Sequence, residues 1–373
     1  MNKIDVIIVD RNVLVRQAIC HVLRNESEFR VIGMGGNIEQ AVNQIKNAVP
    51  DVVLVDIEHP DLDIPSFIKK MERDVPETSI VVLGTRNEHG AQKVITALRL
   101  GAVDFVTKPR QGTHLLFAGR HLSKRLITIT RIATRINHAT TKSELSWNPA
   151  PNNQSRFEEI IPEFCKKETN NFAHSIVLGG CTGSIPALFS IISRLPPDLT
   201  VPVSVVIHLP KHYTKVLAQE LDSQSRINVK EVYDNVELKP GTVWIAAGGY
   251  HTEMVRNGHL IRLHKNHGTR EAGNRPGINV LFRSAAKVYG SRALGIILSG
   301  HGIDGIDGSR AIKMAGGEVL VQDPENALVP ELPLNILRAG IANNYYTVKE
   351  ISEQIIKRIP ANPIDYNQGK INV

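Results

Sequence analysis

Short runs of apolar, mostly β-branched residues alternate with helix-like segments along the first part of the chain. In the helix-like segments the apolar residues recur at helical spacing, whereas the runs between them are continuously apolar. These runs are Ile4–Asp10, Arg30–Ile32, Val52–Asp56, Ile80–Leu83 and Asp104–Val106. Apolar strands that alternate with helices indicate a parallel sheet covered on both faces. We therefore predict a five-stranded, doubly wound α/β domain over residues 1–120.

The same alternation returns in the second half of the chain. The apolar run Ile176–Leu178 breaks into the small residues Gly179–Ser184 and then resumes as a helix with Pro186 in its first turn. Further strand-like runs follow at Val203–Leu209, Thr242–Ala246, Leu294–Leu298 and Val319–Val321. We predict a second doubly wound α/β domain over residues 173–360, followed by a tail over residues 361–373.

The segment between the two domains carries the net charge. Seven basic residues and no acid lie from Arg110 to Lys142, and their sum equals the formal net charge of +7. An apolar stripe continues as far as Ile136, and periodicity is then lost, so we assign residues 121–172 to a basic helix extension and linker. The basic residues either dock on acidic protein, membrane or nucleic acid, or form a solvated helix face.

Composition is typical of a soluble protein with two domains. The chain has 373 residues, of which 42% are hydrophobic and 22% charged. Its three cysteines, Cys20, Cys165 and Cys181, form no disulfide framework, which favours a cytoplasmic location. No segment has the pattern of a signal peptide or a spanning helix, so we expect no membrane insertion.

Asp10, Asp56 and Lys108 each follow an apolar run of the first domain. The carboxyl ends of parallel strands meet at one edge of a sheet, and we expect these side chains to lie together there. Clustered carboxylates bind a hard divalent cation, and a lysine adds a positive charge that can contact a phosphoryl group.

With these residues in place, the first domain resembles a response-regulator receiver, whose fold is flavodoxin-like. The resemblance implies that a histidine kinase phosphorylates Asp56, that Asp10 and Asp56 hold Mg²⁺, and that Lys108 contacts the phosphate. Arg11 stands where the family has a second acid, so its charge weakens the metal site and could pair with Asp56. Thr85 supplies the family's hydroxyl only with a shift of register. The domain either switches or has lost its switch.

The turn Gly179–Ser184 predicts a nucleophile. It sets Cys181 at the carboxyl end of a strand, with the backbone N–H groups of Thr182 and Gly183 as candidates for an oxyanion hole. The alternative is a glycine-rich turn around a buried, inert cysteine. We expect Ser184 to cap the following helix rather than to replace the nucleophile.

His208 and Asp304 also follow apolar runs, in the second domain. Together with Cys181 they would form a catalytic triad. His208 would be the general base that takes the thiol proton, because a thiol reacts as thiolate, and Asp304 would be the acid that fixes the imidazole tautomer. Taken singly, His208 could be satisfied by backbone, and Asp304 could cap a turn.

Several segments in the same order make the second domain similar to the catalytic domain of chemotaxis protein-glutamate methylesterases, the CheB family. They are Leu195–Pro196, Ile207–Pro210, Leu238–Gly241, Leu281–Ala286, Gly302–Gly305, and Gln322–Asp323 leading to Val329 and Leu332–Pro333. The resemblance implies hydrolysis of glutamyl methyl esters, and deamidation of some glutamines, on the cytoplasmic signalling helices of chemoreceptors. It also implies gating by the receiver and no cofactor in the catalytic domain.

The chain departs from this family pattern at sensitive places. Cys181 replaces the family's serine, Ser184 replaces a glycine, and His301 replaces a methionine in the loop before the catalytic aspartate. His301 is either a second imidazole at the site or a surface residue. Within Arg275–Asn279 a small hydroxyl and an acid are also replaced.

Two functions are consistent with the sequence. One is a methylesterase that uses Cys181, His208 and Asp304. The other is a catalytically silent regulatory protein that docks on receptors or kinases, which the joint changes at Arg11 and Cys181 favour. A nucleic-acid-binding regulator would explain the basic segment, but the second domain has no helix-turn-helix pattern, so we expect no nucleic-acid partner.

Overall fold

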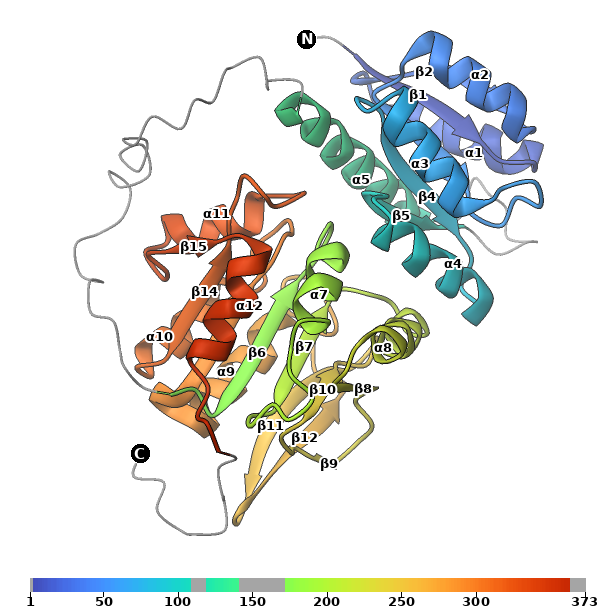
Figure 1. The fold of residues 1–373 in the computed structure, drawn as a ribbon. Coiled ribbons are helices and arrows are strands. Elements are labelled where there is room, and N and C mark those ends of the chain that lie inside the picture. The colour runs from blue at the N-terminus through green and yellow to red at the C-terminus, as the bar shows by residue number, and fades with distance from the viewer. Residues whose placement is uncertain (1–2, 109–118, 141–171, 363–373) are drawn as a thin grey trace. The chain divides into compact units, whose positions relative to one another are not determined.

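The computed structural model describes residues 3–108, 119–140 and 172–362. The chain divides into two compact units, residues 1–148 and 149–373. Figure 1 shows a parallel sheet with flanking helices in each unit.

The first unit contains a five-stranded sheet in the order β2-β1-β3-β4-β5, and every neighbouring pair is parallel. Its strands are β1 (Ile4–Val9), β2 (Phe29–Gly35), β3 (Val52–Asp56), β4 (Ser79–Gly84) and β5 (Asp104–Thr107). β3, β4 and β5 are buried along their whole length, which explains why the middle of each strand is apolar in sequence. The predicted doubly wound domain is confirmed.

Four helices connect these strands, and each begins at a polar side chain. The caps Asn12, Asn37, Asp63 and Asn87 accept a hydrogen bond from an N–H in the first helical turn, which has no partner within the helix. The helices are α1 (Val13–Arg24), α2 (Ile38–Ala48), α3 (Ile64–Asp74) and α4 (Glu88–Arg99).

Helix α5 (Gly119–Thr140) packs against β4 and β5. Its buried side chains include Leu126, Ile129 and Ala133, and the hydroxyl of Ser79 in β4 donates to the carbonyl of Ala133 at 2.8 Å. Part of the predicted basic helix extension therefore packs on the sheet of the first unit. Residues 141–171, most of the predicted linker, lie outside the described part of the chain.

Two side chains of the predicted basic segment are paired within this unit. Arg125 lies 5.1 Å from the ring centroid of Phe105 and 3.6 Å from a carboxylate oxygen of Asp104. Arg131 forms a bidentate ion pair with Glu28. Two of the seven basic side chains of this segment therefore make their contacts within the first unit.

The second unit contains a seven-stranded sheet in the order β15-β14-β13-β6-β7-β10-β8, again with all neighbours parallel. Its strands are β6 (Ser175–Gly180), β7 (Val203–Ile207), β8 (Asn228–Glu231), β10 (Thr242–Ile245), β13 (Ala293–Ile297), β14 (Glu318–Gln322) and β15 (Tyr345–Tyr346). The strand β6, which precedes Cys181, lies between β13 and β7, so loops from three neighbouring strands meet at the nucleophile.

Helices cover both faces of this sheet. The chain passes from β6 through α7 to β7 in one direction, and from β13 through α10 to β14 in the other. Because crossovers between parallel strands are right-handed, α7 and α10 lie on opposite faces. Helix α12 packs against α7, and α9 packs against α10. The helices are α7 (Ile185–Ile192), α8 (Tyr213–Gln224), α9 (Ile278–Tyr289), α10 (Ile306–Met314), α11 (Glu331–Arg338) and α12 (Val348–Lys357).

A small antiparallel sheet, β11-β12-β9, was not predicted from the sequence. Its strands are β9 (Val236–Glu237), β11 (His251–Asn257) and β12 (Leu260–Asn266). Met254, Ile261 and Leu263 from this sheet join the apolar cluster beneath α9. The hairpin thus packs against α9, whose first residues contact the candidate site.

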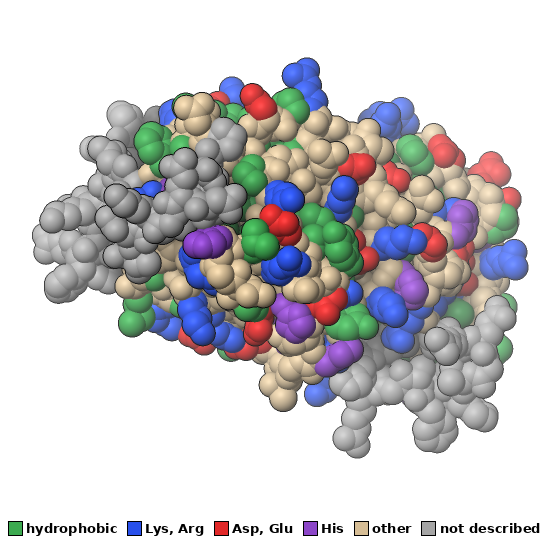
Figure 2. All heavy atoms as spheres, turned by 90° about the horizontal axis from the view of Figure 1, so that it is seen from below, with side chains coloured by type: hydrophobic (Ala, Val, Ile, Leu, Met, Phe, Trp, Pro, Cys, Tyr) green, Lys and Arg blue, Asp and Glu red, His purple; other side chains and the backbone are tan. Residues whose placement is uncertain are grey.

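Basic and acidic side chains are intermixed on the described surface in the view of Figure 2. Among the described residues no helix is long and apolar enough to cross a membrane.

Candidate active site

The nucleophile turn is built by close packing of small residues. A Cβ atom on Gly180 would lie 2.7 Å from the Ser184 side chain, and one on Gly183 would lie 2.6 Å from Leu328. Gly183 also has a φ of +76°, which glycine adopts without strain. Larger residues would therefore force the turn apart and move Cys181.

Hydrogen bonds fix Cys181 at the end of β6. Its N–H donates to the carbonyl of Ser299 at 3.0 Å, and its carbonyl accepts from the N–H of Ser184 at 3.2 Å. The hydroxyl of Ser299 donates to the carbonyl of Thr182 at 2.9 Å. The backbone N–H groups of Cys181 and Ser184 are therefore already engaged in hydrogen bonds. The oxyanion role of the Thr182 and Gly183 N–H groups stays a prediction.

Ser184 is neither a second nucleophile nor a side-chain cap of α7. It is fully buried, and its hydroxyl donates to the carbonyl of Cys181 at 2.6 Å instead of accepting from the helix. Ser184 thus stands at the N-cap position of α7, as expected, but its side chain does not make the capping hydrogen bond.

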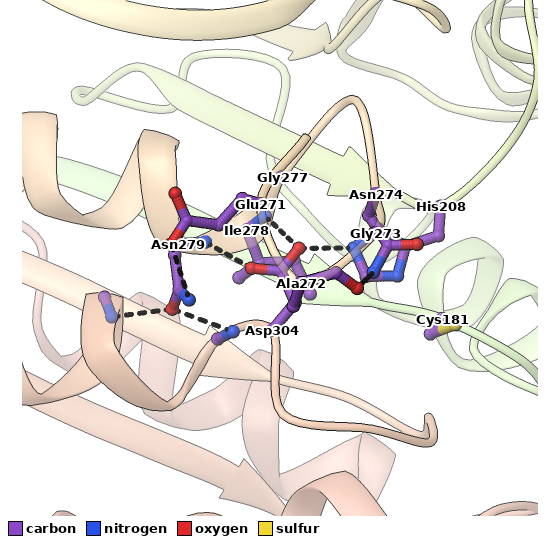
Figure 3. A network of polar contacts seen from close by, with 12 residues as sticks. Cys181, His208, Glu271, Ala272, Gly273, Asn274, Gly277, Ile278, Asn279 and Asp304 are labelled. Carbon is purple, nitrogen blue, oxygen red and sulfur yellow. Dashed lines mark hydrogen bonds and ion pairs between the residues drawn. The ribbon is translucent and has the colours of Figure 1, made fainter. Parts of the chain in front are cut away.

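His208 and Asp304 form a buried pair. His208 Nε2 lies 2.8 Å from Asp304 Oδ2, and both side chains are buried. The carboxylate also accepts from the N–H groups of Ile278 at 2.9 Å and Asn279 at 2.8 Å, at the start of α9. Figure 3 shows Asp304 between the imidazole and this helix terminus. The helix end stabilises the negative charge, so Asp304 can orient His208 as an anion.

Asn279 holds the turn that carries Asp304. Its side-chain oxygen accepts from the N–H groups of Gly305 at 2.9 Å and Gly308 at 2.8 Å. Sequence reasoning noted only that this segment departs from the family pattern, and it missed the role of Asn279. It also missed Ser299, although a polar residue directly after a buried strand was a usable signal.

The electrostatics of the site favour a thiolate. Burial raises the pKa of Cys181, but the charge of His208 and hydrogen bonds from His208 and His301 outweigh it and hold this pKa well below its usual value. Burial lowers the pKa of His208, but the Cys181 charge and the hydrogen bond to Asp304 outweigh it and raise this pKa to about 9. These opposite shifts favour a thiolate beside an imidazolium over a neutral thiol beside a neutral imidazole.

This arrangement can perform acyl transfer. His208 Nε2 is hydrogen-bonded to Asp304, so the buried Nδ1 is the nitrogen that can exchange a proton with the nucleophile. The structure thus brings together the three predicted residues Cys181, His208 and Asp304.

The predicted receiver residues also lie together, but their pairing differs from our expectation. Lys108 Nζ lies 2.7 Å from Asp10 Oδ2 and 2.6 Å from Asp56 Oδ1, and both carboxylates are buried. Arg11 is exposed, so the cation that pairs with Asp56 is Lys108. Thr85 is placed beside another acid, and its hydroxyl donates to Glu58 Oε1 at 2.7 Å.

The receiver residues fit a hard cation only in part. Asp10 and Asp56 offer buried carboxylate oxygens, the ligands that Mg²⁺ prefers. The Lys108 ammonium contacts both carboxylates and offsets one of their two negative charges, so a metal ion would compete with it for the same oxygens. No group of three metal-ligating side chains with suitable geometry occurs among residues 3–108, 119–140 and 172–362.

Two family models match the chain. A model described as CheB methylesterase matches residues 176–355, and the response regulator receiver domain model matches residues 6–118. A protein-glutamate methylesterase/protein-glutamine glutaminase of Trichodesmium erythraeum is 31% identical, over 96% of this chain and 100% of its own length. A protein of the same name from Clostridium acetobutylicum is 33% identical, over 96% of this chain and 98% of its own length. This chain belongs to the CheB family.

A solved structure is also similar to the second unit. The Thermotoga maritima CheB methylesterase catalytic domain is 33% identical, covers 50% of this chain and 98% of its own, and has a TM-score of 0.49. The matched order of a receiver followed by a CheB catalytic domain confirms the predicted architecture.

Proposed function

We propose that this CheB-family protein is a protein-glutamate methylesterase that also deamidates glutamine and uses Cys181 as its nucleophile. The observation that carries the proposal is the Cys181, His208 and Asp304 arrangement, in which a thiolate faces an imidazole fixed by a buried carboxylate. The names of the full-length relatives support the same reaction. The substrates are side chains on the cytoplasmic signalling helices of chemoreceptors, and the protein acts in the cytoplasm.

The reaction proceeds in two steps. The Cys181 sulfur attacks the ester carbonyl carbon, a C–S bond forms, and the imidazolium of His208 gives its proton to the departing methanol. Neutral His208 then takes a proton from water, which attacks the thioester, and the C–S bond breaks to release a glutamate side chain. Asp304 keeps the imidazole oriented throughout. The same sequence on a glutamine amide releases ammonia.

The receiver residues support a second part of the proposal. A histidine kinase phosphorylates Asp56, whose phosphoryl group Lys108 would contact, and Asp10 and Asp56 would hold Mg²⁺. The metal ion neutralises phosphoryl charge when it is bound. Phosphorylation thereby breaks the ion pairs that now join Lys108 to both acids.

Methanol release from a methylated chemoreceptor signalling domain tests the proposed reaction. We expect the full-length chain to release methanol and Cys181→Ala to release none, because alanine has no nucleophile. Cys181→Ser should retain at most a small part of the rate, since oxygen is smaller than sulfur and misplaces the oxyanion, at a cost of about 3 kcal/mol per donor. Recovery with serine but no activity in the natural chain would move the assignment to a silent regulatory protein.

A further inference from the structure

A second imidazole contacts the nucleophile. His301 Nδ1 lies 3.7 Å from the Cys181 sulfur, within hydrogen-bonding range for sulfur. The two-step reaction described above uses His208 alone for proton transfer and gives no role to His301. Its side chain is only half-buried, whereas His208 is deeply buried beside Asp304.

The loop that carries His301 is held at both flanking glycines. The N–H of Gly300 donates to the carbonyl of Val329 at 2.9 Å, and the carbonyl of Gly300 accepts from Leu332 at 2.8 Å. At Gly302 the carbonyl accepts from the Asn335 side chain at 3.1 Å. The N–H of Gly302 donates to the Glu331 carboxylate at 3.2 Å. These four hydrogen bonds hold the loop against α11 and the segment just before it.

The loop also touches the nucleophile directly. A Cβ atom on Gly300 would lie 2.8 Å from the Cys181 Cβ, so only glycine lets the two backbones approach this closely. The backbone on both sides of His301 is therefore held close to Cys181, and from it the imidazole reaches within hydrogen-bonding range of the sulfur. Such a preorganised donor loses little entropy when it stabilises a charge.

The sulfur must carry negative charge at two moments in the reaction. It attacks as thiolate, and it leaves as thiolate when water cleaves the thioester. At the second moment His208 has just taken a proton from water. A second N–H donor at the sulfur would stabilise the departing charge without giving up its proton.

We propose that His301 is a second catalytic imidazole, which donates its Nδ1 N–H to the Cys181 sulfur and stabilises the thiolate in both steps. The role in turnover rests on the proposed function. The hydrogen bond breaks no covalent bond and transfers no proton, so the atoms and charges of the two steps balance as before. Thiolate stabilisation itself does not need a substrate and can be measured separately.

Alkylation of Cys181 by iodoacetamide provides this measurement. The rate at Cys181 is followed against pH in the full-length chain by mass spectrometry of the labelled peptide, because the thiolate is the reactive form. In His301→Met we expect the midpoint of the profile to move to higher pH by about one unit, which lowers labelling about tenfold at acid pH. The variant His301→Gln keeps an N–H donor without charge. Its profile should lie between the profiles of the natural chain and of His301→Met.

Two further variants make the result specific. His259, exposed in the turn between β11 and β12, gives the matched control His259→Met, whose profile should be that of the natural chain. His208→Ala should keep a midpoint below that of the double variant His208→Ala/His301→Met, whose midpoint should lie at or above the ordinary thiol value of about 8.5, because burial then acts alone. Superimposable profiles for the natural chain and His301→Met would overturn the proposal.

Turnover distinguishes the failure of this inference from that of the proposed function. If His301 assists deacylation, His301→Met should accumulate a thioester on Cys181 that mass spectrometry detects during methanol release. A shifted alkylation profile with no methanol release from any variant would contradict the proposed function but support thiolate stabilisation by His301. Methanol release together with an unshifted alkylation profile in His301→Met would support the proposed function and contradict thiolate stabilisation by His301.

Discussion

The thiol of Cys181 determines the proton chemistry at the residue scale. A serine hydroxyl must lose its proton during attack, whereas the pKa of this thiol lies well below its usual value and that of His208 is raised to about 9. The active form of the pair therefore exists before substrate arrives. Proton transfer is then required only toward the leaving group and from water.

This coupling predicts the pH dependence of methanol release. The rate needs deprotonated Cys181 and protonated His208, so kcat/KM should rise as pH passes the lowered pKa of the thiol and fall as pH passes about 9. Asp304 raises the pKa of His208, and Asp304→Asn should move the falling limb to lower pH by about one unit. The exposed Asp307 gives the control Asp307→Asn, for which both limbs should stay in place. A falling limb that is the same in Asp304→Asn and the natural chain would contradict this account.

At the scale of elements, the active site depends on one helix terminus and one turn. The first N–H groups of α9 bind the Asp304 carboxylate, and Asn279 from the same helix binds the turn that follows Asp304. The helix and the turn thus fix each other, and together they fix the position of His208.

Substitution of Asn279 tests this mutual support. Asn279→Ala leaves two buried N–H groups without acceptors, which should lower the free energy of unfolding by about 2 kcal/mol or more and reduce kcat. Asn279→Asp keeps an acceptor oxygen and should lose much less stability. Urea denaturation measures both, with Asn257→Ala in an exposed position of β11 as the control. Equal stability of Asn279→Ala and this control would show that the turn does not need the amide.

The sequence allowed the buried elements to be predicted better than the contacts between their loops. β3 and β6 are continuously apolar because both faces are covered, and the strand ends correctly located Cys181, His208 and Asp304. The β11–β12 hairpin was missed because charged residues interrupt its alternation. The bond from Ser184 to Cys181 and the approach of His301 could not be predicted, because they depend on how loops from separate strands pack together.

At the scale of the whole molecule, the proposed control of the esterase by the receiver depends on the charges at Asp10, Asp56 and Lys108. Lys108 pairs with both carboxylates and offsets one of their two negative charges. On the proposed function, a phosphoryl group on Asp56 would compete for Lys108 and favour a second state. Any difference in activity between the two states is a coupling free energy, which in allosteric proteins commonly corresponds to a factor of about 5 to 150.

Beryllofluoride with Mg²⁺, a mimic of the phosphorylated aspartate, tests this coupling in the full-length chain. We expect it to raise methanol release about tenfold in the natural chain and to leave Asp56→Asn unchanged, because the variant cannot hold the mimic. Arg11→Asp adds a third carboxylate near Asp10 and removes a positive charge, so half-maximal activation should need less Mg²⁺. The exposed Arg86 supplies the control Arg86→Asp, which changes the receiver charge equally. If Arg11→Asp binds Mg²⁺ and the mimic but its methanol release does not change, the receiver does not gate the esterase.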